Sequence, residues 1–191
     1  MTDQRCGVIA IVGRPNVGKS TLLNHLLGQK LSITSRKPQT TRNQVLGVST
    51  QGRTQLIFVD TPGLHLGQSK AINKMMNKAA ASALTGVDLT LLLCDRTKWT
   101  AEDDYVLDVV FRHEAPVALV INKTDLLRDR DELLPFVEAL STRCRFDAVL
   151  PVSALRARGL EELTEFVDAH APMGPHLFPE DQITDRSQRF V

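Results

Sequence analysis

The 191-residue sequence lacks several features that would point to particular classes of protein. Its three cysteines, Cys6, Cys94 and Cys144, are widely spaced and include no C-x-x-C pair. We therefore expect reduced thiols rather than a disulfide framework or a zinc site. No apolar stretch reaches the roughly 18 residues of a transmembrane helix, and the apolar run before Gly13 is too short for a secretory signal. These absences predict a soluble, cytoplasmic protein without a transmembrane segment.

An excess of charge of one sign is also missing. The chain has 23 Lys and Arg residues against 22 Asp and Glu residues, so the net charge indicates neither a nucleic acid nor an acidic membrane as partner. Internal repeats and low-complexity segments are absent as well. With 42% hydrophobic and 24% charged residues, the chain has the size and composition of one large globular domain, alone or with a tail.

Short apolar runs alternate with segments of helical periodicity, which indicates an α/β fold with helices on both faces of a mostly parallel sheet. Two runs meet at Gln51-Gly52, a hairpin signal that predicts one antiparallel edge strand. We predict buried strands at 8–12, 55–59, 89–93, 117–121 and 148–152, and helices at 20–28, 70–84, 101–113, 131–143 and 159–170. With the second strand of the hairpin, the sheet has six strands.

The alternation stops after Pro172, where the chain becomes rich in proline and loses its periodicity. We therefore predict a folded domain over residues 1–172 and a linker or tail over residues 173–191.

A phosphate-binding motif lies between the first predicted strand and helix, because GRPNVGKS fits G-x-x-x-x-G-K-[ST] in the required context. Its two glycines allow a tight turn whose N–H groups point at phosphate oxygens, and the start of the helix adds attraction. Lys19 can neutralise the β- and γ-phosphates, and the Ser20 hydroxyl can ligate Mg²⁺. The motif predicts a P-loop NTPase with a Ras-like sheet. Its nucleotide-binding residues are Gly13, Arg14, Pro15, Asn16, Val17, Gly18, Lys19, Ser20 and Thr21.

A second motif, NKTD, follows another buried strand and suits guanine. The Asp125 carboxylate can accept from guanine N1–H and the exocyclic amine together, whereas adenine has neither donor on that edge. We expect Asn122 to tie this loop to the phosphate loop and the Lys123 stem to cover the base. From the later VSAL stretch, the Ala154 amide is expected to donate to guanine O6. The predicted base-binding residues are Asn122, Lys123, Thr124, Asp125, Ser153, Ala154 and Leu155.

Two further segments fit nucleotide-sensing switches. In DTPGL, Asp60 is expected to hold Mg²⁺ through water and the Gly63 amide to touch the γ-phosphate, so Asp60, Thr61, Pro62, Gly63 and Leu64 join the nucleotide site. The polar segment 32–44 suits a mobile loop that becomes ordered when Thr41 closes on Mg²⁺ and the γ-phosphate, with Thr40 as the competing ligand. The predicted metal ligands are Ser20, Thr41 and Asp60.

In this order, GRPNVGKS, PQTTR, DTPGLH and NKTD resemble the Era family of bacterial GTPases, within the TrmE–Era–EngA group. The late stretch PEDQITDRSQRF extends the resemblance over nearly the whole chain. The resemblance implies a cytoplasmic, Mg²⁺-dependent switch that cycles between GTP and GDP and assists maturation of the 30S ribosomal subunit. It also implies binding of 16S rRNA through a C-terminal KH domain and peripheral association with the inner membrane.

The sequence departs from this family at its end, because it stops at Val191, where the resemblance predicts the KH domain to begin. A KH domain needs a G-x-x-G loop, and no two of the 11 glycines are three positions apart. We therefore expect the GTPase domain without its KH domain, and RNA binding as a property of a longer parent protein.

Leu64 stands where many GTPases carry a glutamine that holds the attacking water. The resemblance implies that Asn16 compensates by helping to hold K⁺ beside the phosphates; an ordinary turn residue is the alternative. Arg14 and Arg42 are rival arginine fingers, although we expect both in solvent or at partners, and His65 is a weaker candidate base. The predicted catalytic residues are Lys19, Asn16, Thr41 and Gly63.

Other readings stay open. A P-loop kinase of a small acceptor would share the phosphate loop, but NKTD and the switch pair argue against it. A binding module that does not hydrolyse GTP would explain Leu64 as lost catalysis. An EngA half or a TrmE insert domain would share the chemistry, but not the C-terminal stretch. The segment 70–78 is expected to form a solvated helix face through its lysines and part of the core through Ile72, Met75 and Met76, with a partner site as the alternative.

Overall fold

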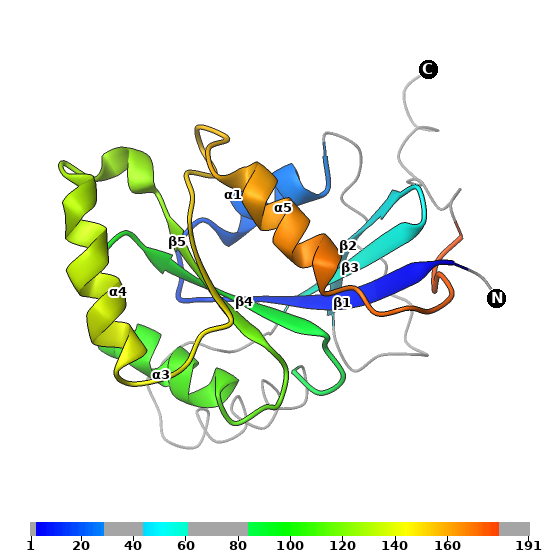
Figure 1. The fold of residues 1–191 in the computed structure, drawn as a ribbon, viewed down its shortest axis with the longest axis horizontal. Helices are drawn as coiled ribbons and strands as arrows, with labels where there is room; N and C mark the ends of the chain where they lie inside the picture. The colour runs from blue at the N-terminus through cyan, green and yellow to red at the C-terminus, as the bar shows by residue number, and fades with distance from the viewer. Residues whose placement is uncertain (1–2, 29–43, 61–83, 180–191) are drawn as a thin grey trace.

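The computed structural model describes residues 3–28, 44–60 and 84–179. Its centre is a six-stranded sheet in the order β2-β3-β1-β4-β5-β6 (Figure 1). The strands are β1 (Arg5–Val12), β2 (Gln44–Gln51), β3 (Thr54–Asp60), β4 (Leu89–Asp95), β5 (Val117–Asn122) and β6 (Ala148–Pro151). All neighbouring strands are parallel except β2 and β3, which form an antiparallel hairpin at one edge of the sheet. This confirms the predicted sheet.

The hairpin turns where the sequence predicts. Gln51 pairs with Thr54, so Gly52 and Arg53 form a two-residue connection, and Gly52 has a φ of +57°. Glycine adopts this left-handed conformation without steric cost, as two-residue hairpins require.

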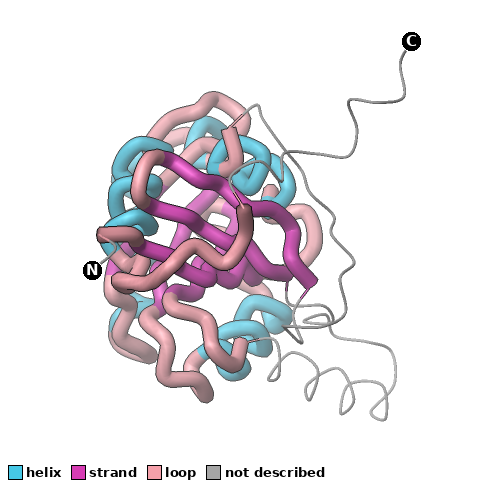
Figure 2. Tube along the Cα trace, turned by 90° about the vertical axis from the view of Figure 1, so that its right-hand side faces the viewer, coloured by secondary structure: helices cyan, strands magenta, loops and turns pink. Residues whose placement is uncertain are grey.

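Helices cover both faces of the sheet, as Figure 2 shows from the side. On one face lie α1 (Lys19–Leu26) and α5 (Leu160–Ala169), and on the other lie α3 (Ala101–Val110) and α4 (Leu133–Ser141). Successive residues of β4 alternate between the two cores: Leu91 packs with the first layer and Leu92 with the second. Burial on both faces explains why the strands read as continuous apolar runs.

Two of the predicted helices differ from the structure at their ends. The helix expected at 131–143 begins at Leu133, because Arg130–Glu132 forms a separate 3₁₀ turn in which the Asp129 side chain accepts from the Asp131 amide at 2.9 Å. The helix expected at 101–113 ends at Val110, and tighter i→i+3 hydrogen bonds carry the chain onward to His113. The helix expected at 20–28 spans Lys19–Leu26, one residue earlier at its start, and the helix expected at 159–170 spans Leu160–Ala169. The helix expected at 70–84 falls almost wholly outside the described residues.

The first part of the predicted linker lies against the sheet. The buried side chain of Gln55, on β3, accepts hydrogen bonds from the amides of Leu177 and Phe178, both at 2.9 Å, and donates to the Phe178 carbonyl at 2.9 Å. Gln55 also donates to the Thr50 hydroxyl at 3.0 Å, and Phe178 packs against the core on the α3 and α4 side. The chain is therefore held to the domain as far as residue 178, whereas residues 180–191 lie outside the described part.

We expect Gln55→Leu to release this segment, because the substitution leaves three backbone groups without their partner. The free energy of unfolding should fall by about 2–4 kcal/mol. Urea denaturation measures the loss, and limited proteolysis with mass spectrometry shows whether cleavage appears near residue 177. The control is Gln51→Leu on the exposed end of β2, which should change stability by less than about 0.5 kcal/mol. Equal stability and equal cleavage in both variants would contradict the role of Gln55.

Candidate functional site

The loop from β1 to α1 has a backbone that accepts only glycine at two places. Gly13 and Gly18 have φ values of +150° and +102°. A Cβ on Gly13 would lie 2.6 Å from the Leu93 carbonyl oxygen, and one on Gly18 would lie 2.3 Å from Asn122 Nδ2. The glycines of the predicted phosphate motif are therefore needed both for the turn and for close packing against β4 and β5.

Lys19, at the start of α1, folds back over this loop. Its Nζ donates to the carbonyl oxygens of Gly13 at 2.7 Å and Arg14 at 2.9 Å. Ser20 and Thr21 follow in the exposed first turn of α1, and that turn has no acidic residue. The ammonium group, the positive end of the helix and the turned backbone together form a cradle that favours phosphate.

Asn122, at the end of β5, joins the phosphate loop to the base loop. The side chain is 2% exposed. Its Nδ2 donates to the Val17 carbonyl at 2.8 Å, and its Oδ1 accepts from the Ala154 amide at 3.0 Å. The predicted tie between the two loops is confirmed, and the residues after β6 are joined to it. All three loops follow parallel strands, whose carboxyl ends lie at the same edge of the sheet.

The residue expected to read guanine is fixed by a neighbour from the next loop. The Ser153 hydroxyl donates to Asp125 Oδ1 at 2.5 Å, and Thr124 donates to the Val152 carbonyl through its hydroxyl at 2.9 Å. Leu155, two residues after Ser153, is 72% exposed. The Asp125 carboxylate is thus oriented before any base arrives, which reduces the cost of binding.

The Ala154 amide, which the sequence analysis expects to donate to guanine O6, has a partner within the protein. It donates to Asn122 Oδ1 in the structure, so a bond to guanine O6 would have to be shared with this contact or replace it. The O6 contact of Ala154 stays a prediction.

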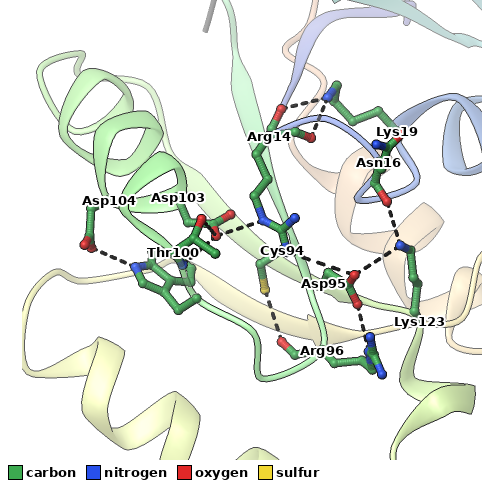
Figure 3. Close-up of polar contacts among 12 residues, drawn as sticks. Arg14, Asn16, Lys19, Cys94, Asp95, Arg96, Thr100, Asp103, Asp104 and Lys123 are labelled. Atoms are coloured by element: carbon green, nitrogen blue, oxygen red, sulfur yellow. Dashed lines mark hydrogen bonds and ion pairs between the residues drawn. The ribbon is translucent and has the colours of Figure 1, made fainter. Parts of the chain in front are cut away.

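Lys123 spans the distance between the base loop and the phosphate loop (Figure 3). Its Nζ donates to the Asn16 carbonyl at 2.6 Å and lies 3.1 Å from Asp95 Oδ2. Asn16 and Lys123 both adopt left-handed backbone conformations, with φ of +63° and +62°. The exposed Pro15 and Asn16 form the outer part of the phosphate loop.

Asp95, the last residue of β4, is a site residue that the sequence analysis missed. The residue is 8% exposed, and its carboxylate accepts from Arg96 Nε at 2.8 Å and from Lys123 Nζ at 3.1 Å. Burial is the largest single influence and raises the pKa of Asp95, but the hydrogen bonds and charges of Arg96 and Lys123 together lower it below its usual value. The one sign in the sequence that could have identified Asp95 was its position at the end of a buried strand.

The expectation that Arg14 lies in solvent or at a partner is wrong. Its guanidinium donates through Nε to Asp103 Oδ2 at 3.0 Å, and its side chain is only 17% exposed. Asp103 lies in the first turn of α3 and is itself 2% exposed, so this buried carboxylate requires a cationic partner. The Thr100-x-x-Asp103 spacing was a local sign of a helix start, but nothing in the sequence linked it to Arg14.

Nearly all of the predicted switch residues lie outside the described residues. These residues are Arg42, Thr40 and Thr41 from the first switch segment, Thr61, Pro62, Gly63 and Leu64 from the second, and His65. Asp60 ends β3, but its side chain lies outside that description too. Of the predicted metal ligands Ser20, Thr41 and Asp60, only the Ser20 side chain is described, and its exposed position beside Lys19 suits a hydroxyl ligand. Elsewhere in the described ranges, no three His, Cys, Asp or Glu side chains gather as a metal site.

Comparison with known proteins gives a consistent result. A family model described as 50S ribosome-binding GTPase matches residues 8–123. The chain is similar to GTPase Era of Marinobacter nauticus, with 56% identity over 99% of this chain and 62% of the relative. It is also similar to GTPase Era of Pseudomonas fluorescens, with 55% identity over the whole chain and 65% of the relative. The chain thus spans less than two thirds of the length of these curated relatives.

Solved structures agree with this comparison. A crystal structure of Era in complex with MgGDPNP and nucleotides 1506–1542 of 16S ribosomal RNA matches with a TM-score of 0.77 and 39% identity, over 95% of this chain and 62% of the other. The G domain of the T. maritima FeoB iron transporter matches with a TM-score of 0.61 and 26% identity, over 86% of this chain and 98% of the other. The second match covers nearly the whole of that G domain.

We expect Gly18→Ala to abolish tight nucleotide binding, because the new methyl group would collide with the Asn122 amide and separate the two loops. Gly86→Ala is the matched control: Gly86 also has a positive φ, +80°, but a Cβ there would meet nothing within 4 Å. The control should lose only about 1 kcal/mol of stability, because alanine is strained at a positive φ. Titration with a fluorescent GDP analogue should show at least a hundredfold weaker binding for Gly18→Ala alone, since about 3 kcal/mol of contacts is lost. Equal binding by both variants would contradict the contact.

Proposed function

We propose that this chain, which belongs to the 50S ribosome-binding GTPase family, is the GTPase domain of an Era protein and a Mg²⁺-dependent switch that hydrolyses GTP to GDP and phosphate. The observation that carries the proposal is the Asn122 side chain, which binds the phosphate loop at Val17 and the loop after β6 at Ala154. The Asn122 side chain thus joins the proposed phosphate cradle to the loops that hold the carboxylate proposed to read guanine.

The phosphate end of the nucleotide is held by the loop of residues 13–18 and by Lys19. The carbonyls of Gly13 and Arg14 keep the Lys19 ammonium over the loop, where it offsets phosphate charge. We propose Ser20, Asp60 and Thr41 as the ligands of Mg²⁺; of these, only the Ser20 side chain lies in the described residues. Mg²⁺ held there would supply positive charge that offsets the negative charge of the phosphates.

The base end is selective for guanine. Asp125, oriented by Ser153, accepts from two guanine donors that adenine lacks, so bound ATP would leave the carboxylate without these two hydrogen bonds. The Lys123 stem covers the base while its ammonium group binds Asn16 and Asp95. The loop proposed to read guanine argues against a P-loop kinase of a small acceptor, so we prefer the GTPase.

Catalysis without a water-holding glutamine requires another source of positive charge or positioning. The pairing of Arg14 with Asp103 turns its guanidinium toward α3 and removes it from the candidate fingers. We propose that Asn16, exposed on the phosphate loop, helps to hold K⁺ beside the phosphates, and that Gly63 and Thr41 position the γ-phosphate. Arg42 and a residue from a partner remain the rivals.

The proposed partners follow from the relatives. Era binds a 16S rRNA fragment in the structure similar to this chain. We propose that the protein containing this domain acts on the 30S subunit through 16S rRNA in the cytoplasm, with peripheral contact to the inner membrane. Within the ranges that the structure covers, no helix is long and apolar enough to cross a membrane.

We expect Asp125→Asn to change the preferred nucleotide from GDP to XDP, because the new amide donates where the carboxylate accepted and xanthine has a carbonyl in place of the 2-amino group. GDP affinity should fall by about 10²–10³-fold, in line with a lost charged hydrogen-bond pair. Competition titration with GDP and XDP measures the change. Asp131→Asn, an exposed acid after the same loop, serves as the control and should keep GDP preference. If Asp125→Asn keeps the wild-type preference, the base-reading assignment is wrong.

Hydrolysis is tested by single-turnover assays with Mg²⁺ in KCl and in NaCl at equal ionic strength. We expect phosphate release to be at least tenfold faster in KCl, an advantage that Asn16→Ala removes because the amide ligand is lost. Asn24→Ala, on the exposed side of α1, should keep the potassium effect.

Equal rates in both salts would overturn the role of Asn16 in potassium binding. Tight GTP binding without phosphate release in either salt would favour the binding module over the enzyme.

A further inference from the structure

Beyond the nucleotide contacts, we propose that Asp103 is a positioning residue for the phosphate loop. It acts through Arg14, so that the start of α3 controls how firmly the domain retains its nucleotide. The inference rests on the proposed guanine-nucleotide function and adds a regulatory handle that is remote from the nucleotide itself.

Asp103 is the point where α3 meets the phosphate loop (Figure 3). Its Oδ2 accepts from Arg14 Nε at 3.0 Å, from the Thr100 amide at 2.9 Å and from the Thr100 hydroxyl at 2.8 Å. One buried oxygen therefore both caps the first turn of α3 and holds the loop. A carboxylate that is 2% exposed depends on these partners, so its position and that of Arg14 are strongly linked.

Arg14 passes this constraint on to the phosphate-binding lysine. Its side chain binds Asp103, while its backbone carbonyl accepts from Lys19 Nζ at 2.9 Å. A shift of the Arg14 backbone therefore moves an acceptor that holds Lys19 over the phosphates. The geometry links α3 to the ammonium group through a single residue.

The opposite side of the phosphate loop is also held through an acidic side chain. Arg14 also lies 4.0 Å from Asp95, and Asp95 pairs with Lys123, which donates to the Asn16 carbonyl. The phosphate loop is thus held at Arg14 and at Asn16 by two acidic side chains from β4 and α3. Releasing the Asp103 contact leaves the Asn16 side held, so we expect a looser loop and not an unfolded domain.

Asp104 offers a matched comparison. It follows Asp103 directly, but its carboxylate accepts from Trp99 Nε1, just before α3, at 2.7 Å and pairs with Arg143, just after α4, at 2.6 Å. Asp104 thus has a charge and a helix position similar to those of Asp103 without a contact to the phosphate loop. Any effect shared by both residues would reflect the helix in general.

The experiment measures release of a fluorescent GDP analogue from the wild-type chain and from Arg14→Gln, Asp103→Asn and the double variant. We expect each single substitution to speed release about tenfold, and the double variant to be no faster than either, because both remove the same link. Simple electrostatics predicts the opposite sign for Asp103→Asn, since loss of a negative charge near a phosphate site should slow release. The direction of the change therefore separates positioning from charge.

Two controls separate positioning from stability. Thr100→Val removes a hydroxyl bond to Asp103 but keeps its pairing with Arg14, and Asp104→Asn removes the neighbouring charge; both should keep the wild-type release rate. Circular dichroism confirms that every variant is folded at the assay temperature. Slower or unchanged release from Asp103→Asn, additive effects in the double variant, or equal effects from Thr100→Val would overturn the proposal. Failure of the wild-type chain to bind GDP would instead overturn the proposed function and, with it, this inference.

Discussion

The site depends on one buried amide. Asn122 uses both of its polar atoms on backbone groups of two other loops, and its burial means that each lost bond would leave an unpaired group at a cost of about 1–3 kcal/mol. The contact also explains the glycine at position 18, since a side chain there would occupy the space of the amide. The phosphate and base ends of the site therefore have a fixed spacing, as a ligand with both chemistries requires.

A second constraint is charge. A loop that binds a polyanion collects cations, and here Arg14 and Lys123 are each paired with a buried or nearly buried acid, Asp103 or Asp95. Both side chains are directed toward these acids, while the Lys19 ammonium group donates to the carbonyls of the phosphate loop. The acids thus serve the site through positioning, although neither is expected to touch the nucleotide.

Much of this arrangement could be predicted from local patterns. Strands buried on both faces appear as continuous apolar runs, and motifs that follow parallel strands must meet at one edge of the sheet. The role of Asn122 could be predicted because it belongs to the NKTD motif, whose loop must be tied to the phosphate loop for one nucleotide to reach both. The Arg14–Asp103 pair joins residues 89 positions apart, and Gln55 reaches Phe178 across 123 positions, so neither has a periodic or local signal. Such contacts follow from tertiary packing, which single-sequence patterns do not encode.

The central claim is that the joined loops form a site for guanine nucleotides. The most direct test is competition between GDP and ADP for the wild-type chain, with Mg²⁺ and a fluorescent GDP analogue as the probe. We expect ADP to compete at least about a thousandfold more weakly, because adenine has neither of the two donors that guanine offers to the Asp125 carboxylate. Displacement of the probe by ADP at concentrations similar to GDP would contradict it.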